Sequence, residues 1–175
     1  MQKGFVLWLT GLSGSGKTTL GDRIEKELKQ KGYLAERLDG DLIRKHLWQD
    51  LGFAKEDRDE HIRRAGFLAA LLSRNGIGVI ASFISPYRAE REGARKQAQN
   101  FIEVFCNCPL DVCKQRDEKG LYEKAERGEI QNFTGVSDPY ELPENPEIEL
   151  HTDTASIEEN TQKILDYLKE HGYIQ

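Results

Sequence analysis

Gly11-Leu-Ser-Gly-Ser-Gly-Lys17-Thr18 lies between an apolar run, residues 5–9, and a run of helix-forming residues, 20–30. A strand, a glycine-rich turn and a helix in this order form a phosphate cradle, because glycines let successive backbone N–H groups turn toward the oxygens. The start of the helix adds a partial positive charge at the same point. A plain glycine-rich connection would not need a lysine and a threonine in this register. The stretch therefore predicts a nucleoside triphosphate site and leaves the acceptor of the phosphate open.

Two side chains of this stretch have chemical roles in such a cradle. Lys17 supplies a mobile cation for the β- and γ-phosphates, and the Thr18 hydroxyl is a candidate ligand of Mg²⁺. We therefore expect Lys17 to be catalytic, ATP to be the phosphate donor and Mg²⁺ to accompany it. The predicted ATP-binding residues are Gly11, Leu12, Ser13, Gly14, Ser15, Gly16, Lys17, Thr18 and Thr19.

The composition restricts the class of protein. The chain has 175 residues, a length typical of one domain, and carries a net charge of −5. This acidic balance disfavours non-specific binding to nucleic acid, so an anionic substrate must be held by local clusters of arginine and lysine. The apolar runs fall far short of the roughly 20 residues that a membrane span needs. We expect a soluble, cytoplasmic protein with small-molecule substrates and no nucleic-acid or membrane partner.

Three cysteines, Cys106, Cys108 and Cys113, lie close together in the sequence. Their spacing is compatible with a metal or redox cluster, but no fourth cysteine or histidine lies nearby to complete a usual ligand set. Burial as small side chains on a strand and the next helix is the favoured interpretation. The residues before the first predicted strand, 1–4, are too few for a signal peptide, which favours reduced thiols in the cytosol.

Predicted strands alternate with predicted helices along the whole chain, which is typical of βαβ units on a parallel sheet. Residues 117–135 are polar, charged and interrupted by three glycines, and we expect them to form a mobile lid. The predicted class is α/β, one domain over residues 1–175, with five mainly parallel strands and helices on both faces. The expected strands are 5–10, 33–38, 76–81, 101–106 and 147–150, and the expected helices are 16–31, 42–47, 56–75, 86–99, 110–116 and 156–171.

In such sheets, ligands bind outside the carboxyl ends of the strands. Residues 10–18, 39–41, 82–85 and Asn107 follow four predicted strands and should therefore share one rim. The third strand is followed by Ser82, where many ATPases with this cradle have an acid for the metal. The metal must then be held by the cradle threonine together with an acid that follows the second strand.

Asp39 and Asp41 follow the second strand and are the candidate acids. A carboxylate near an acceptor hydroxyl orients or deprotonates it, and carboxylates hold Mg²⁺ directly or through water. Asp41 also suits the N-cap of the helix that begins at Leu42, and the two roles are compatible. We expect Asp39 to be catalytic and to bind the metal together with Thr18.

Arginines, an aromatic residue and a serine make up the candidate acceptor site. Arg44 and Arg58 bracket Phe53 in the sequence, and an aromatic ring between two guanidinium groups suits a base attached to an anion. Solvated surface charge is the alternative for each arginine. Ser85 precedes Pro86, and its alternatives are a contact with the acceptor, a phosphate carrier and a cap of the next helix.

Together these motifs resemble the adenylyl-sulfate kinase family, and the resemblance covers nearly the whole chain. The most specific parts are Ser82-Phe-Ile-Ser-Pro-Tyr-Arg88 and Lys119-Gly-Leu-Tyr122 followed by Phe133-Thr-Gly135. The resemblance implies the three-layer fold of the P-loop NTPases. The other matching segments are Trp8 to Thr18, Leu38 to Asp41 with Arg44, Asp50 to Phe53, Asp57-Arg58, Ile62 to Arg64, Arg116-Asp117 and Pro139 to Glu141.

The resemblance implies transfer of the ATP γ-phosphate to the 3′-hydroxyl of adenylyl sulfate, giving 3′-phosphoadenylyl sulfate and ADP in sulfate assimilation. Asp39 would be the carboxylate near the acceptor hydroxyl and Mg²⁺, and Phe53 and Phe133 would clasp the adenine. Ser85 matches a serine described in the family as a phosphoserine intermediate, so the resemblance makes it catalytic, although direct in-line transfer needs no such intermediate. The implied substrate-binding residues are Asp39, Asp41, Arg44, Phe53, Arg58, His61, Ile84, Ser85, Lys119, Leu121 and Phe133.

Three positions depart from the family pattern: His61 and Trp48 stand where asparagine is common, and Asn107 stands where aspartate is frequent. His61 puts one expected hydrogen bond to the substrate in question, though an imidazole also donates or accepts. Family members commonly form homodimers and occur free or fused to ATP sulfurylase, so we expect a homodimer that works with that enzyme or is fused to it. The alternatives are another small-molecule kinase, acting on a sugar acid, shikimate or a nucleoside monophosphate, and a non-catalytic nucleotide-binding module.

Overall fold

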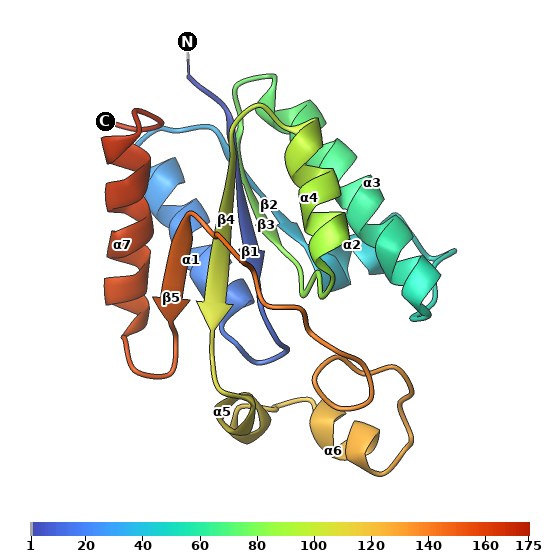
Figure 1. The fold of residues 1–175 in the computed structure, drawn as a ribbon. Coiled ribbons are helices and arrows are strands. Elements are labelled where there is room, and N and C mark those ends of the chain that lie inside the picture. The colour runs from blue at the N-terminus through green and yellow to red at the C-terminus, as the bar shows by residue number, and fades with distance from the viewer. Residues whose placement is uncertain (1) are drawn as a thin grey trace.

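The computed structural model describes residues 2–175, whose central feature is a five-stranded sheet (Figure 1). The strands lie in the order β2-β3-β1-β4-β5, and every neighbouring pair is parallel. The predicted α/β class is confirmed, and the sheet is wholly rather than mainly parallel. The strands are β1 (Phe5–Thr10), β2 (Ala35–Asp39), β3 (Gly78–Ser82), β4 (Phe101–Asn107) and β5 (Ile148–His151).

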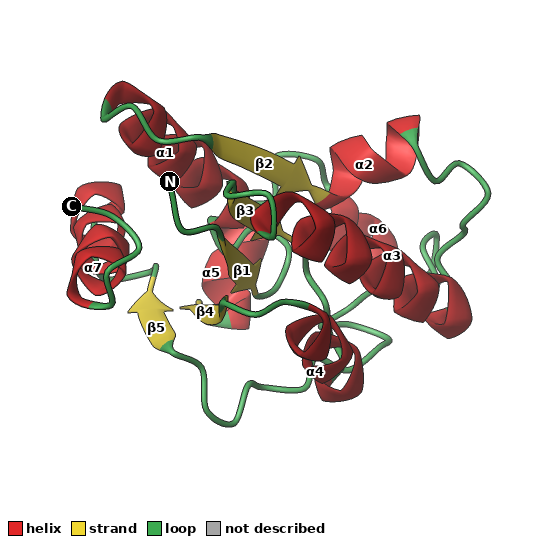
Figure 2. Cartoon of the chain, turned by 90° about the horizontal axis from the view of Figure 1, so that it is seen from above, coloured by secondary structure: helices red, strands yellow, loops and turns green. Residues whose placement is uncertain are grey.

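Helices cover both faces of the sheet and give the molecule three layers, which Figure 2 shows from above. α1 packs against α7 on one face, and α3 packs against α4 on the other (Figure 1). Parallel neighbours require such crossover connections, which is why strands and helices alternate along the chain. The helices are α1 (Lys17–Gln30), α2 (Gly40–His46), α3 (Lys55–Ser73), α4 (Arg88–Gln97), α5 (Leu110–Gln115), α6 (Leu121–Glu126) and α7 (Ile157–Glu170).

The central strand β1 separates the two halves of the core. Phe5, Leu7 and Leu9 join the apolar cluster under α1 and α7, whereas Val6 and Trp8 join the cluster under α3 and α4. Successive side chains of a strand point to opposite faces, so a strand covered on both faces is apolar throughout. Each of these five side chains is at most 1% exposed. The one polar aliphatic side chain of β1, that of Thr10, therefore lies at the end of the strand.

α5 and α6 lie beyond the carboxyl ends of the strands, at the base of the view in Figure 1. The sequence pattern does not predict α6, because its six residues lie in a polar segment that three glycines interrupt. This helix is anchored by two buried side chains, Tyr122 and Ala125. It begins after Gly120, whose φ of +63° is a conformation that glycine adopts freely. The mobility of the predicted lid, residues 117–135, stays a prediction.

Two predicted helix caps are wrong. Asp39, the last residue of β2, caps α2 in place of Asp41, because its Oδ1 accepts hydrogen bonds from two backbone N–H groups of that helix, both at 3.1 Å. α4 begins at Arg88 with Tyr87 in the N-cap position, so Ser85 does not cap it. The carboxylate that sequence patterns suggested for chemistry thus also fixes the direction in which the chain leaves β2.

Candidate active site

The carboxyl ends of the strands bring the predicted segments together. Asp39 at the end of β2 pairs with Ser82 at the end of β3, which in turn pairs with Leu9 of β1. Thr10, the last residue of β1, pairs with Phe105 of β4. Because all these strands run in one direction, the residues that follow them meet at one edge of the sheet, as predicted.

The glycine-rich cradle between β1 and α1 depends on backbone conformations that glycine adopts freely. The angle φ is +76° at Gly14 and +88° at Gly16. A Cβ atom on Gly14 would lie 2.8 Å from the carbonyl oxygen of Cys113, so the cradle also packs closely on α5. α1 begins at Lys17, directly after the cradle, and directs its free N–H groups and partial positive charge into the same space.

Lys17 is folded into this cradle. Its ammonium group donates to the carbonyl oxygen of Leu12 at 2.6 Å and to the hydroxyl of Ser15 at 3.4 Å. The side chain is buried, and this burial lowers the pKa of Lys17, whereas the nearby carboxylates of Asp41 and Asp39 act in the opposite direction. The contacts with Leu12 and Ser15 hold the Lys17 ammonium group where the predicted ATP site requires a cation. Phosphate oxygens bound in the cradle would compete for the same ammonium group.

Asp39 directs its two carboxylate oxygens to different partners. Oδ1 is used by the start of α2, while Oδ2 accepts from the Thr18 hydroxyl at 3.2 Å and from Nη1 of Arg37 at 3.0 Å. The two predicted metal ligands are therefore adjacent, and both are oxygen donors of the kind that Mg²⁺ prefers. Within residues 2–175, no three His, Cys, Asp or Glu side chains gather as a metal cage. This donor set fits an ion that takes its remaining ligands from phosphate and water.

Arg44 connects α2, the turn before α3 and α3 itself. Its Nη1 donates to the carbonyl oxygen of Gly52 at 2.5 Å, and its Nη2 lies 2.5 Å from Nδ1 of His61. Its guanidinium carbon lies 4.9 Å from the centre of the Phe53 ring. That ring is 66% exposed, which is unusual for a phenylalanine. A ring that is held by a cation and is otherwise open suits stacking on a base.

His61 is enclosed by Trp48 and Phe83, which contact its ring edge-to-face at centroid distances of 5.0 and 5.4 Å. Burial, and then the charge of Arg44, lower the pKa of His61 to about 3. A guanidinium group only donates, so the neutral imidazole accepts at Nδ1 and carries its hydrogen on Nε2. Nε2 is buried, and none of the described residues accepts its hydrogen. Two departures from the family pattern, His61 and Trp48, thus pack on each other and present one buried donor.

Arg58 ties the turn that carries Phe53 to the segment that carries Phe133. Its Nε donates to the carbonyl oxygen of Phe53 at 3.1 Å. On the other side, Nη1 donates to the Thr134 hydroxyl at 2.6 Å and to the Asp138 carboxylate at 3.1 Å, and Nη2 donates to a backbone carbonyl of the same segment. Four of the five N–H groups are thus used within the protein. Arg58 therefore links the two parts of the predicted pocket, and one of its N–H groups has no partner among the described residues.

The lid segment is docked on the cradle. Tyr122 of α6 donates its hydroxyl hydrogen to the carbonyl oxygen of Ser13 at 2.8 Å, and its side chain is 2% exposed. Lys119 pairs with Asp41 at 3.0 Å, but these side chains are 67% and 85% exposed. Leu121, the first residue of α6, is half-buried. Exposed ion pairs contribute little, so the packing of Tyr122 holds the lid in this position.

Ser85 belongs to a group of hydroxyls at the point where the cradle begins. Its Oγ accepts from the Trp8 indole N–H at 3.0 Å and lies 3.0 Å from Oγ1 of Thr10, and the residue is 2% exposed. Oγ1 of Thr10 also lies 2.8 Å from the carbonyl oxygen of Ile84 and 2.9 Å from the Tyr140 hydroxyl. The family resemblance names Ile84 and Ser85 as site residues but does not name Thr10 or Tyr140. Both of these residues lie in matching segments, and Thr10 also lies on the predicted rim.

The remaining predicted features are structural. The three cysteines are free and buried, as the favoured interpretation predicts. Nδ2 of Asn107 donates to a carboxylate oxygen of Glu149 at 2.8 Å and so joins β4 to β5. In the described part of the chain, the helices lack the combination of length and apolar composition that a membrane span requires.

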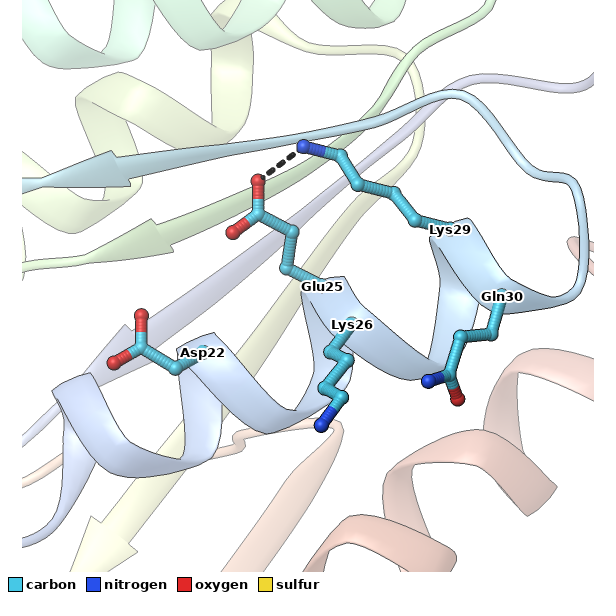
Figure 3. Close-up of a pocket in the computed structure, with 5 residues that line it drawn as sticks. All are labelled: Asp22, Glu25, Lys26, Lys29 and Gln30. Carbon is cyan, nitrogen blue, oxygen red and sulfur yellow. Dashed lines mark hydrogen bonds and ion pairs between the residues drawn. The ribbon is translucent and has the colours of Figure 1, made fainter.

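A hollow on the outer face of α1 is separate from this site. Asp22, Glu25, Lys26, Lys29 and Gln30 line it, all from one helix (Figure 3). Lys29 donates to Glu25 at 2.7 Å, so part of its charge is already paired. It contains none of the predicted site residues, and we do not assign a function to it.

An all-parallel sheet whose first strand runs into the phosphate cradle, with an acid at the end of the neighbouring β2 and a lid over the cradle, is the architecture of a P-loop kinase. Within that class, the model of the family described as "Adenylylsulphate kinase" matches residues 3–151. The chain belongs to this family.

Individual proteins agree with this assignment. The adenylyl-sulfate kinase of Halothermothrix orenii is 58% identical over 173 residues, which are 99% of this chain and 94% of that protein. The structure of the Mycobacterium tuberculosis APS kinase in complex with AMPPNP and APS is 44% identical, with a TM-score of 0.93 over 97% of this chain and 99% of that chain. A gluconokinase from Sinorhizobium meliloti is 19% identical, with a TM-score of 0.60 over 96% of this chain and 93% of that chain, and shows the fold alone.

Proposed function

We propose that the protein transfers the γ-phosphate of ATP to the 3′-hydroxyl of adenylyl sulfate, giving 3′-phosphoadenylyl sulfate and ADP in sulfate assimilation. The observation that carries this proposal is the link that Arg58 makes between the turn of Phe53 and the segment of Phe133. It supports a pocket with two aromatic residues on segments that one arginine joins, and Phe53 lies against the guanidinium group of Arg44. Such a pocket suits a purine nucleotide, whereas a sugar acid or shikimate offers no aromatic ring to stack.

On the donor side, the ATP phosphates would lie against the backbone N–H groups of residues 11–19. Lys17 would move from its present carbonyl partner to the β- and γ-phosphates. Thr18 and Asp39 would hold Mg²⁺, which supplies charge that neutralises the phosphate oxygens during transfer. Lys119 would add a further positive charge from the lid.

On the acceptor side, we assign the orientation of the 3′-hydroxyl to Asp39. Its bonds to the start of α2 fix the carboxylate in one rotamer, which favours a preorganised contact. A loose in-line transition state needs a positioned acceptor more than a strong base. Ser85 is enclosed by Trp8 and Thr10, and we propose direct transfer without a phosphoserine.

We also propose that the protein acts in the cytoplasm as a homodimer, free or fused to ATP sulfurylase. The three free, buried cysteines are consistent with a reducing compartment. The expected measurement is a mass of two subunits by light scattering in solution. A monomer, or an assembly larger than two subunits, would contradict the homodimer.

A coupled ADP-release assay tests the proposed reaction. The purified protein is given ATP and Mg²⁺ with adenylyl sulfate, gluconate, shikimate or AMP as the acceptor. We expect rapid ADP release with adenylyl sulfate and background release with the other three compounds. Turnover of gluconate, shikimate or AMP without turnover of adenylyl sulfate would refute the proposal, and ATP binding without turnover would favour a non-catalytic nucleotide-binding module.

A further inference from the structure

Arg91, on α4, is a buried charge that the predicted site does not use. It is 3% exposed, and its Nε donates to Oε1 of Glu103 on β4 at 2.8 Å. Removing both charges from water costs free energy that the pair does not always regain, so a buried pair is weak evidence for stability alone. The contacts of the other two nitrogens of the Arg91 guanidinium group show which segments the buried pair holds in place.

Two backbone carbonyl groups from different segments meet at Arg91. Nη1 donates to the carbonyl oxygen of Ser85, and Nη2 donates to the carbonyl oxygen of Glu141, both at 2.7 Å. The N–H group of Glu141 donates in turn to the carbonyl oxygen of Pro86 at 2.8 Å. Arg91 thereby joins the loop after β3 to the chain that returns from the lid.

Ser85 has a backbone conformation that needs such support. Its φ is +42°, in the left-handed region that residues with a Cβ atom rarely occupy. Charge-assisted hydrogen bonds are about twice as strong as neutral ones. The bond from Arg91 to the Ser85 carbonyl therefore stabilises the peptide in this unusual orientation.

The hydrogen bonds around Ser85 form a connected network in which each hydroxyl donates once. Thr10 has one hydroxyl hydrogen, and its closest backbone acceptor is the carbonyl oxygen of Ile84 at 2.8 Å. Oγ1 of Thr10 must then accept from the hydroxyls of both Ser85 and Tyr140. Thr10 directly precedes the cradle at Gly11, whereas Ile84 and Ser85 belong to the predicted acceptor pocket. This network of hydrogen bonds thus joins the ATP side of the site to the side that is predicted to bind the phosphate acceptor.

We propose that Arg91 is a positioning residue for phosphoryl transfer, because it holds Ser85 so that the acceptor pocket keeps its spacing from the ATP cradle. The proposal rests on the proposed function, which makes Ile84 and Ser85 part of the acceptor pocket. It requires two effects together: a displaced Ser85 and slower transfer. A misplacement of about 1 Å is enough to lower the rate of an enzyme by about 10²-fold.

Arg91→Lys keeps the positive charge, but a single ammonium group cannot reach all three oxygens that Arg91 contacts, which belong to Glu103, Ser85 and Glu141. The matched control is Arg95→Lys, because Arg95 lies on the same helix and bonds to Glu103 and Glu147 without touching Ser85. We expect Arg91→Lys to lower kcat by about 10- to 100-fold and to raise KM for adenylyl sulfate, with KM for ATP within twofold. We expect Arg95→Lys to leave all three constants within twofold.

Trp8 reports the position of Ser85 without any substrate. The chain has two tryptophans, so in a Trp48→Phe background the tryptophan emission comes from Trp8. Its indole N–H donates to Ser85 Oγ, and we expect Arg91→Lys to shift this emission and Arg95→Lys to leave it unchanged. This readout does not depend on the identity of the acceptor, so a failure of the proposed function would appear separately, as wild-type protein that does not phosphorylate adenylyl sulfate.

If Arg91→Lys folds poorly, the double variant Arg91→Met with Glu103→Gln replaces it in both measurements. Both members of the buried ion pair are then neutral, so neither is left as an unpaired buried charge. The same changes in emission and kcat are expected of it. Unchanged kcat and KM in folded Arg91 variants would overturn the proposal. A lowered kcat with unchanged Trp8 emission would also overturn it, because Arg91 would then act by a route other than Ser85.

Discussion

The side chain of Asp39 has both a structural role and a proposed chemical role. Its Oδ1 caps α2, and its Oδ2 accepts from Thr18 and Arg37. Replacement by alanine would therefore remove a helix cap as well as a charge. Asparagine is as good an N-cap as aspartate, so Asp39→Asn separates the two effects.

We expect Asp39→Asn to lower kcat by at least about 10²-fold, because the acceptor hydroxyl and the metal lose a negative oxygen. KM for ATP should change little, since the cradle itself is intact. Steady-state kinetics at saturating Mg²⁺ measure both constants, and thermal unfolding confirms that the cap is preserved. Turnover near the wild-type rate would remove Asp39 from its assigned role.

His61 links the stability of the protein to pH. Its pKa is lowered from an ordinary value of 6.5 to about 3, mainly by burial. Between these pH values the unfolded chain binds a proton at His61 that the folded chain does not, so the stability contributed by neutral His61 is present above pH 6.5 and is lost as pH falls toward 3. The slope is at most about 1.4 kcal/mol per pH unit.

We expect His61→Asn to remove this slope. Urea unfolding of the wild-type protein and of the variant at several values between pH 4 and pH 6.5 measures the difference, and the other histidines cancel between the two. The free energy of unfolding of the wild-type protein should fall more steeply with decreasing pH. Parallel curves would mean that His61 is protonated in the folded protein.

Among the elements, α3 carries the contact that closes the predicted acceptor pocket. Arg58 lies in the first turn of this helix and bonds both to the preceding turn and to Thr134 and Asp138, at the end of the lid segment and just after it. Arg63 lies on the same helix and, among the described residues, bonds only to Glu60, one turn away. The two arginines therefore form a matched pair: one joins distant segments, and the other stays within its helix.

We expect Arg58→Lys to raise KM for adenylyl sulfate by about tenfold, a loss of about 1.4 kcal/mol, because one ammonium group cannot hold both segments. KM for ATP should stay within twofold. Arg63→Lys should leave both constants unchanged. A rise in KM for ATP alone would show that the pocket around Phe53 belongs to the donor nucleotide instead.

The lid offers a second comparison between elements. Tyr122 packs in a cluster with Cys108 and Cys113, whereas Lys119 makes an exposed ion pair with Asp41. We expect Tyr122→Ala to increase the rate of amide hydrogen exchange in residues 121–126, because the helix loses its anchor. Lys119→Ala should leave that exchange unchanged, because exposed ion pairs contribute little. Equal effects of the two variants would contradict this view of lid docking.

At the scale of the whole molecule, the fold follows from patterns that are local in sequence. The apolar run before Gly11 and the glycines of the cradle predict β1, the turn and α1, and the alternation of strands and helices predicts the sheet. The shared rim follows because parallel strands end at the same edge. The sequence pattern does not predict the helix α6 or the links made by Arg58 and Arg91, because these depend on partners far along the chain, which no local period encodes. The cap made by Asp39 is local, and the pattern misplaces it because Asp41 is an equally good capping residue.

The identity of the product tests the proposed reaction most directly. The protein is incubated with ATP, Mg²⁺ and adenylyl sulfate, and the products are separated by chromatography and characterised by phosphorus NMR. We predict ADP and 3′-phosphoadenylyl sulfate in equal amounts. ADP without a phosphorylated adenylyl sulfate, or a product that carries its new phosphate elsewhere than on the 3′-oxygen, would contradict the proposed function.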